Sequence, residues 1–199
     1  MLNNNICFLT ITIRLKIDTY RSHFFLSQSL YFFAPYLLPQ MTEIYTLRNA
    51  LTLNATGLKV DAVASPTFDR EIIKHNKSFN FDFISLTKNY TIYKLHVTSE
   101  PEIIQGFVGF RQTPGILECA NMETNNFNKH NNAVYNGVGK ALIALCCKIS
   151  IDNGMEGFIY FDAKNRLVPY YQRFGAKLIF GLRMVIEPDQ AKKLVDLYF

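Results

Sequence analysis

Cysteine is scarce in this sequence, and its spacing disfavours a metal site. The four cysteines are Cys7, Cys119, Cys146 and Cys147. They form no CxxC pair and no Cys/His cluster at the spacing of zinc ligands. Adjacent Cys146 and Cys147 stand inside an apolar run, where small buried thiols are common. Reduced thiols of this kind are typical of a cytoplasmic protein, and we expect no metal.

Clustered positive charge is also missing. The formal net charge is +5, and residues 1–40 hold Arg14, Lys16 and Arg21 against Asp18. The remaining residues therefore carry 18 basic and 15 acidic side chains, a net charge of +3. No stretch forms the Lys/Arg stripe expected of a nucleic-acid footprint, so a nucleic-acid partner is disfavoured.

The length of 199 residues, half of them apolar, indicates one folded domain with an extension. Residues 1–40 are crowded with aromatic and aliphatic side chains, and no Asp, Glu, Lys or Arg occurs from Ser22 to Thr42. Pro35, Pro39 and several polar residues interrupt this span, which argues against a membrane helix. We therefore expect an extension over 1–40 outside the fold and a domain over 41–199. A membrane anchor and a partner-binding arm remain the alternatives.

The first half of the domain predicts an antiparallel meander. Residues 41–80 give a weak signal: a short helix or strand over 51–60, then a helix that starts at Pro66. Three β-rich runs follow, Thr91–Val97, Ile103–Gln112 and Gly115–Met122. The break at Thr113-Pro114-Gly115 is short enough for a hairpin.

The second half alternates between helix and strand. Periodicity and breakers predict a helix from Gly139 to Gly154, a strand over 157–161, a helix over 167–174, one or two strands over 178–186 split near Gly181, and a helix over 191–198. The order is therefore β-β-β-α-β-α-β. It indicates an α/β (α+β) fold with a mixed, mostly antiparallel central sheet flanked by helices.

A glycine-rich turn opens the first of these helices. The segment Val134-Tyr135-Asn136-Gly137-Val138-Gly139 places small residues where a helix leaves its first N–H groups unbonded, which suits a phosphate. A nucleotide-hydrolysing P-loop is excluded, because Val134 and Ala141 replace its first glycine and its Ser/Thr. The dinucleotide fingerprint fails as well, since its third glycine position is Leu142.

These features together resemble the GNAT superfamily of N-acetyltransferases over about residues 80–199. The meander ends in an acidic strand, Glu118 to Glu123, and the turn is similar to the family's Gln/Arg-x-x-Gly-x-Gly/Ala. The later helix, Tyr170-Tyr171-Gln172-Arg173-Phe174-Gly175-Ala176, is similar to the family's Tyr-x-x-x-Gly-Phe ending. More narrowly, Lys140 to Phe161 and the tail Met184–Phe199 resemble a bacterial branch of uncharacterised substrate.

The resemblance implies acetyl-CoA as co-substrate, with its pyrophosphate on the turn. The implied cofactor-binding residues are Tyr135, Asn136, Gly137, Val138, Gly139, Lys140 and Ala141. Three positions depart from the pattern. Val134 stands where Gln or Arg is usual, so that Lys140 or Tyr135 would have to supply a substitute contact. Lys164 takes the place of a pantetheine-binding Asn, and Ala176 that of the final aromatic residue.

Acetyl transfer to an amine needs a base for the ammonium and a donor for the departing thiolate. Glu123, near the end of the third strand, is the candidate base. Glu118 lies five residues earlier, so strand alternation places it on the opposite face unless the strand is bulged. Tyr171 matches the family position that reaches the coenzyme sulfur and is the candidate acid, with Tyr170 as its competitor.

The predicted function is transfer of an acetyl group from acetyl-CoA to a primary amine by direct attack in a ternary complex. The acceptor is an amine-bearing molecule of unknown class, and a homodimer is one allowed assembly. The alternatives are a non-catalytic CoA-binding module and a toxin-like acetyltransferase acting on aminoacyl-tRNA or a ribosomal protein. A polar loop over 125–136, with six asparagines and His130, is expected either to connect flexibly or to shape the site.

Overall fold

A computed structural model of the protein describes residues 43–129 and 133–199. Within these ranges nine strands form one sheet, in the order β6-β1-β2-β3-β4-β5-β7-β9-β8. The strands are β1 (Tyr45–Leu53), β2 (Lys59–Pro66), β3 (Thr91–Val97), β4 (Glu100–Thr113), β5 (Ile116–Thr124), β6 (Tyr135–Asn136), β7 (Ile159–Asp162), β8 (Lys177–Phe180) and β9 (Arg183–Ile186). The predictions for residues 1–40 and for His130 concern residues outside the described ranges.

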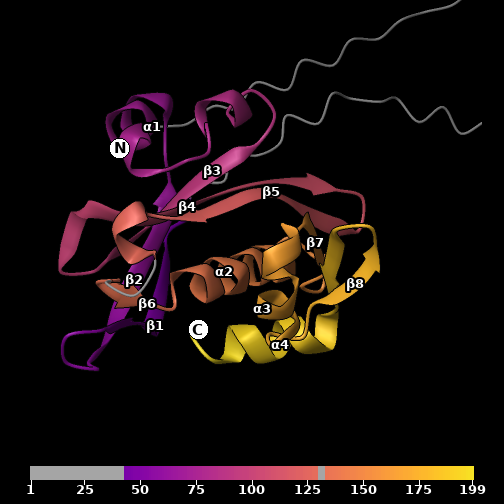
Figure 1. Cartoon of the computed structure of the whole chain (residues 1–199). Helices are drawn as coiled ribbons and strands as arrows, with labels where there is room; N and C mark the ends of the chain where they lie inside the picture. Colours follow the sequence, from indigo (N-terminus) through magenta and orange to yellow (C-terminus); the bar gives the residue numbers. More distant parts are fainter. Residues whose placement is uncertain (1–42, 130–132) are drawn as a thin grey trace, which may run out of the picture. The chain divides into compact units, whose positions relative to one another are not determined.

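The helices lie on both faces of the sheet (Figure 1). They are α1 (Asp69–His75), α2 (Val138–Asp152), α3 (Val168–Gln172) and α4 (Pro188–Asp196). α2 belongs to the larger apolar core, together with residues of α3, α4 and most strands. α1 and the segment that follows it contribute to a smaller core on the other face, built around Phe79, Phe83 and Phe107. We call these two sides the α2 face and the α1 face.

The sheet is antiparallel except where β5 pairs with β7. The predicted mixed, mostly antiparallel sheet flanked by helices is therefore confirmed. The predicted hairpin also occurs, because β4 ends at Thr113 and β5 begins at Ile116. Gly181 separates β8 from β9, as its position in the sequence indicated.

The prediction for residues 41–80 was partly wrong: a strand and a following helix occur, but there are two strands and the helix starts later than expected. The two strands, β1 and β2, occupy residues 45–53 and 59–66. Pro66 ends β2 instead of starting a helix, and α1 begins three residues later at Asp69. Pro66 sits where β2 leaves the sheet, a position that tolerates a residue without a backbone N–H. In β1 the pairing register shifts between Leu47 and Leu51, which hid the two-residue alternation of the strand.

Candidate active site

The glycine turn opens α2 as predicted, and its geometry requires glycine. Gly137 is the N-terminal capping residue with φ of 98°, a left-handed conformation that L side chains rarely adopt. A Cβ atom there would also lie 2.9 Å from the Ala50 carbonyl oxygen of β1. Gly137 supplies no side-chain cap, and no acidic residue stands in the first turn of α2. The positive end of a 15-residue helix is therefore left without a neutralising side chain.

The predicted turn residues divide into donors and supports. In an α-helix the first-turn N–H groups, here those of Val138, Gly139 and Lys140, have no partner within the helix. Ala141 differs, because its N–H already donates to the Gly137 carbonyl at 2.9 Å. Ala141, which the resemblance also assigns to cofactor binding, therefore has its N–H engaged within the helix, and its methyl group is buried.

Tyr135 and Asn136 have side chains that are already engaged. The Tyr135 ring is buried, its hydroxyl hydrogen-bonds Glu100, and its N–H donates to the Asn128 side chain at 2.8 Å. The Asn136 amide donates to Asn54 in the turn between β1 and β2. Both residues therefore hold the turn against the sheet.

The asparagine-rich loop contains anchors that the sequence did not single out. Asn125 is buried and donates to the Ile104 carbonyl at 2.8 Å. Asn128 is buried as well and donates to the Gln105 side chain, which has no exposed surface. The described part of the loop is thus tied to β4 by buried amide groups. The many asparagines in the loop could have indicated such anchors, whereas nothing in the sequence pointed to Gln105 as their partner.

Beside the turn, β5 and β7 separate. They share two parallel pairs, Leu117 with Ile159 and Glu118 with Tyr160. From Cys119 onward β5 continues to Thr124 while β7 pairs only with β9. The β7-facing edge of β5 therefore has no strand partner among the described residues, and its main-chain groups can bind an extended ligand.

Tyr170 and Tyr171 stand between this opening and the turn, on the α2 face. The Tyr171 ring packs edge-on against Phe161 of β7, with centroids 4.8 Å apart, and the residue belongs to the main core. The Tyr170 hydroxyl lies 2.8 Å from the position that a Cβ atom on Gly139 would take. Gly139 therefore allows α3 to approach the first turn of α2 closely.

Both phenols are held in the protonated form. Burial, followed by the neighbouring Tyr170 and Cys119, raises the pKa of Tyr171 to about 12. Burial also raises the pKa of Tyr170, although Arg173 opposes the shift. Neither hydroxyl has a hydrogen-bond partner in residues 43–129 and 133–199. Each can therefore donate a proton to a ligand.

Glu118 and Glu123 lie on the same face of the sheet, contrary to the prediction from strand alternation. A β-bulge causes the difference: Gly109 pairs with Asn121 and Phe110 with Cys119, so Ala120 is an extra residue in β5. Both carboxylates consequently point to the α1 face. Leu117 and Cys119, the neighbours of Glu118 in the strand, point to the α2 face.

Glu123 is tightly held. Its oxygens accept the backbone N–H groups of Asn80 and Phe81, at 3.1 and 2.9 Å, and pair with the Lys129 ammonium at 2.5 Å. Burial alone would raise the pKa of Glu123, but the Lys129 ammonium and the two N–H donors outweigh it and lower the pKa. These contacts suit a carboxylate that positions the 80–81 segment, and they weaken Glu123 as a base.

Glu118 forms a denser network at the last pair before the opening. It accepts the Tyr90 hydroxyl at 3.0 Å and the Arg111 guanidinium at 2.6 Å, and the Tyr160 hydroxyl of β7 also helps to lower its pKa. Burial would raise the pKa of Glu118, but these three donors outweigh it and lower the pKa. The network therefore ties β4, β5 and β7 together where the sheet divides.

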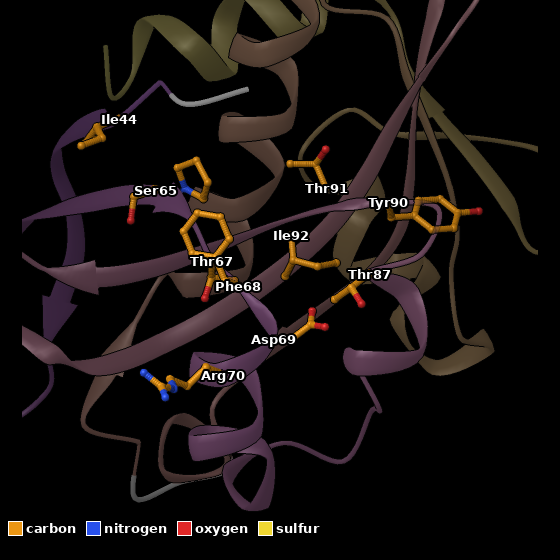
Figure 2. A pocket seen from close by; sticks show the side chains of 11 residues that line it. Ile44, Ser65, Thr67, Phe68, Asp69, Arg70, Thr87, Tyr90, Thr91 and Ile92 are labelled. Atoms are coloured by element: carbon orange, nitrogen blue, oxygen red, sulfur yellow. The ribbon is translucent and has the colours of Figure 1, made fainter. Parts of the chain in front are cut away.

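A cavity of about 710 Å³ opens on the α1 face near this network. Figure 2 shows it between the end of β2, the start of α1 and the start of β3, with Phe68, Thr87 and Ile92 on its wall. None of the residues predicted from the sequence lines it. It shares Tyr90 with the Glu118 network.

The remaining reactive groups in the described ranges are possible metal ligands and buried thiols. In the described ranges, no group of three or more His, Cys, Asp or Glu side chains is arranged to hold a metal ion. A hydrogen bond to Cys146, and then burial, raises the pKa of the Cys119 thiol, and burial raises that of Cys147, so these thiols are poor nucleophiles. No helix among the described residues is long and apolar enough to cross a membrane.

Comparison with solved structures places the fold. The crystal structure of AtaTR bound with acetyl-CoA matches with a TM-score of 0.50 and 12% identity, over 67% of this chain and 97% of that one. The chain has the GNAT acetyltransferase fold. An Escherichia coli ribosomal-protein-S18-alanine N-acetyltransferase matches at a TM-score of 0.47 and 11% identity, over 62% and 90% of the two chains. A Desulfovibrio desulfuricans protein assigned to the GNAT family matches with a TM-score of 0.46 and 11% identity, over 64% of this chain and 99% of that one.

No protein-family model matches the sequence, and no curated protein matches it either. Within the GNAT fold, the departure at Val134 is visible in the structure, since this side chain is apolar and 43% exposed beside the turn. The polar side chain that the resemblance implies is absent there, so the candidate site depends on the backbone donors of α2.

The contacts of Glu123 predict its effect on stability. Glu123→Gln should lower the free energy of unfolding by about 1–3 kcal/mol at pH 7, because an amide cannot replace a carboxylate that accepts several donors. The pKa of Glu123 is lower in the folded than in the unfolded chain. The carboxylate therefore stabilises the fold above its unfolded pKa of about 4.3, and this stabilisation is lost as the pH falls through the folded pKa.

Urea denaturation of wild type and variant between pH 3.5 and 7.5 measures this. The difference between the two should be constant above pH 5.5 and should shrink in acid. Glu102→Gln is the control, since Glu102 makes a 3.6 Å pair with Lys74 and its side chain is 85% exposed; it should change the unfolding free energy by less than about 0.5 kcal/mol. An equal effect of both variants would contradict the prediction.

Proposed function

We propose that this protein transfers the acetyl group of acetyl-CoA to an amine. The observation that carries the proposal is the juxtaposition of an uncapped α2 N-terminus, an unpaired edge of β5 and two protonated tyrosines between them. The GNAT fold supports it, and the AtaTR structure that shares this fold was determined with acetyl-CoA. Acyl transfer uses each of these three features.

The coenzyme would lie along the opening on the α2 face. Its pyrophosphate would accept the N–H groups of Val138, Gly139 and Lys140, where the helix dipole favours negative charge. Its pantetheine arm carries amide groups, which can bond the main chain of β5 from Cys119 to Thr124 as an added strand would. The thioester would then lie near the bulge and Tyr171.

Tyr171 would stabilise the departing thiolate. A thiol has an ordinary pKa of about 8.5, so full proton transfer from a phenol of pKa about 12 is uphill by roughly 5 kcal/mol. The hydroxyl therefore acts by donating a hydrogen bond as charge develops on sulfur, which is where such a donor is most effective. The acceptor loses two protons: its ammonium gives one to a base before attack, and the tetrahedral adduct gives up the second, which ends on the thiol. Tyr170 is the rival for this role.

The acceptor would approach from the α1 face, because α2, α3 and the coenzyme occupy the other. Glu118 and Glu123 both face that side. We retain a carboxylate as the candidate acceptor of the ammonium proton, acting directly or through water. Glu118 stands at the last pair before the opening, but donors lower its pKa as they lower that of Glu123, so both carboxylates stay candidates.

The function is tested by binding and by turnover. Calorimetry should detect acetyl-CoA binding, and release of free CoA thiol should be observed with one class in a panel of polyamines, peptide N-termini, ribosomal proteins and aminoacyl-tRNA. Binding without acetylated product in any class would favour a non-catalytic CoA-binding module. An acetylated product found only with aminoacyl-tRNA or ribosomal protein would favour the hypothesis of a toxin-like acetyltransferase. Absence of acetyl-CoA binding would overturn the proposal.

Tyr171→Phe should lower kcat by about ten- to a hundredfold, the effect of removing one hydrogen-bond donor to a developing charge. The dissociation constant of acetyl-CoA should stay within about twofold, because the hydroxyl acts on the transition state. Single-turnover kinetics with saturating acetyl-CoA measures the step. Tyr170→Phe is the matched control, and a large loss in that variant alone would transfer the role to Tyr170.

Gly139→Glu should abolish acetyl-CoA binding, since it places a side chain and a negative charge at the phosphate position. The substitution would also displace the Tyr170 hydroxyl. The double variant Gly139→Ala/Tyr170→Phe separates these effects, because without the hydroxyl the nearest ring atoms lie 3.6 and 3.7 Å from the new methyl group, an ordinary contact. Calorimetry should show the double variant within about tenfold of wild type. Unchanged affinity in Gly139→Glu would contradict the phosphate assignment.

A further inference from the structure

The segment from Ala163 to Ile186 is unusually one-sided in charge. It contains Lys164, Arg166, Arg173, Lys177 and Arg183, and no Asp or Glu. Lys177 pairs with Glu187 at 2.5 Å and Arg183 with Asp162 at 2.9 Å. Lys164, Arg166 and Arg173 form no ion pair with any residue that the structure describes. The segment includes α3, so uncompensated positive charge lies next to the glycine turn.

Arg173 is held one aromatic ring away from that turn. It follows directly after α3, and its guanidinium carbon lies 5.4 Å from the centre of the Tyr170 ring. The hydroxyl of the same ring contacts Gly139 at the start of α2. An arginine stacked on an aromatic ring keeps its N–H donors at the edge of that ring. The edge of the Tyr170 ring adjoins the glycine turn, so the donors of Arg173 lie near the turn.

Lys140 reaches the same group of rings from α2. Its ammonium nitrogen lies 5.6 Å from the centre of the Phe174 ring and 5.8 Å from that of Tyr198. Phe174 packs edge-on against Tyr170, with centroids 4.7 Å apart. Lys140 and Arg173 therefore flank one aromatic pair, and Lys140 too has no ion pair within the described ranges.

The charge of the coenzyme exceeds what the turn can neutralise. CoA carries a pyrophosphate diester and a separate 3′-phosphate, and a phosphomonoester has a charge of about −1.5 to −2 at pH 7. The α2 N-terminus supplies roughly half a positive charge. Val134 contributes none, whereas Lys140 and Arg173 are two cations held on the aromatic rings beside the turn.

Building on the proposed function, we infer that Arg173 and Lys140 bind the 3′-phosphate of CoA. Arg173 offers the planar fork that matches two phosphate oxygens, and Lys140 adds a point charge from the side of the turn. The site thereby selects 3′-phosphorylated CoA over its dephospho form. The acetyl group and the acceptor take no part in this selection.

The test compares CoA with 3′-dephospho-CoA by calorimetry at fixed ionic strength. Wild type should bind CoA about thirtyfold more tightly, as expected for two charge-assisted contacts on a partly exposed phosphate. Arg173→Gln and Lys140→Gln should each reduce this ratio by about fivefold, and the double variant should bring it near one. The affinity for 3′-dephospho-CoA should change by less than about twofold in Arg173→Gln, which lies outside the pyrophosphate turn.

Lys177→Gln is the matched control. It removes the same charge from the same segment, but Lys177 lies on β8 and is paired with Glu187. In this variant the ratio of the affinities for CoA and 3′-dephospho-CoA should equal that of wild type. Equal affinity of wild type for the two ligands would overturn the inference, and so would variants that weaken both ligands alike. If neither ligand binds, the proposed function fails and the inference with it, a result distinct from equal binding.

Discussion

The parting of β5 from β7 after two parallel pairs is the constraint on which the rest of the site depends. A sheet that divides leaves main-chain donors and acceptors along β5 without strand partners, and such groups are costly when they are shielded from water. The Glu118 network fixes the point where the parting starts, because Tyr90, Arg111 and Tyr160 converge on one carboxylate there. The bulge at Ala120 then turns the free part of β5.

The turn of α2 is held by neutral hydrogen bonds. Asn128 binds the Tyr135 N–H and Gln105, and Asn54 binds Asn136. Ion pairs at these positions would have placed charges next to the helix N-terminus and altered the field there. Amide side chains fix the same geometry and leave the dipole of α2 available to an anion.

The local part of this architecture could be predicted from the sequence, and the long-range part could not. The meander, the Gly137 turn and the split hairpin at Gly181 are encoded by residues close together in the chain. The bulge at Ala120 leaves no trace in residue type, so alternation placed Glu118 and Glu123 on opposite faces. β1 was obscured in the same way: Asn49 has φ of 51° and donates its N–H to Asp61, which interrupts the two-residue period.

The placement of the two strand acids has a consequence for how the reaction is divided in space. Tyr170 and Tyr171 lie on the α2 face, whereas Glu118 and Glu123 lie on the α1 face. A thioester in the opening would therefore meet its hydrogen-bond donor on one side of the sheet and a carboxylate on the other. In acyl transfer the amine attacks one face of the planar thioester carbonyl, whereas the leaving sulfur lies in that plane. A carboxylate on one side of the divided sheet and a phenol on the other would therefore serve the attacking and the leaving group separately. The cavity lined by Tyr90 lies on the carboxylate side, from which an acceptor would approach under the proposed function.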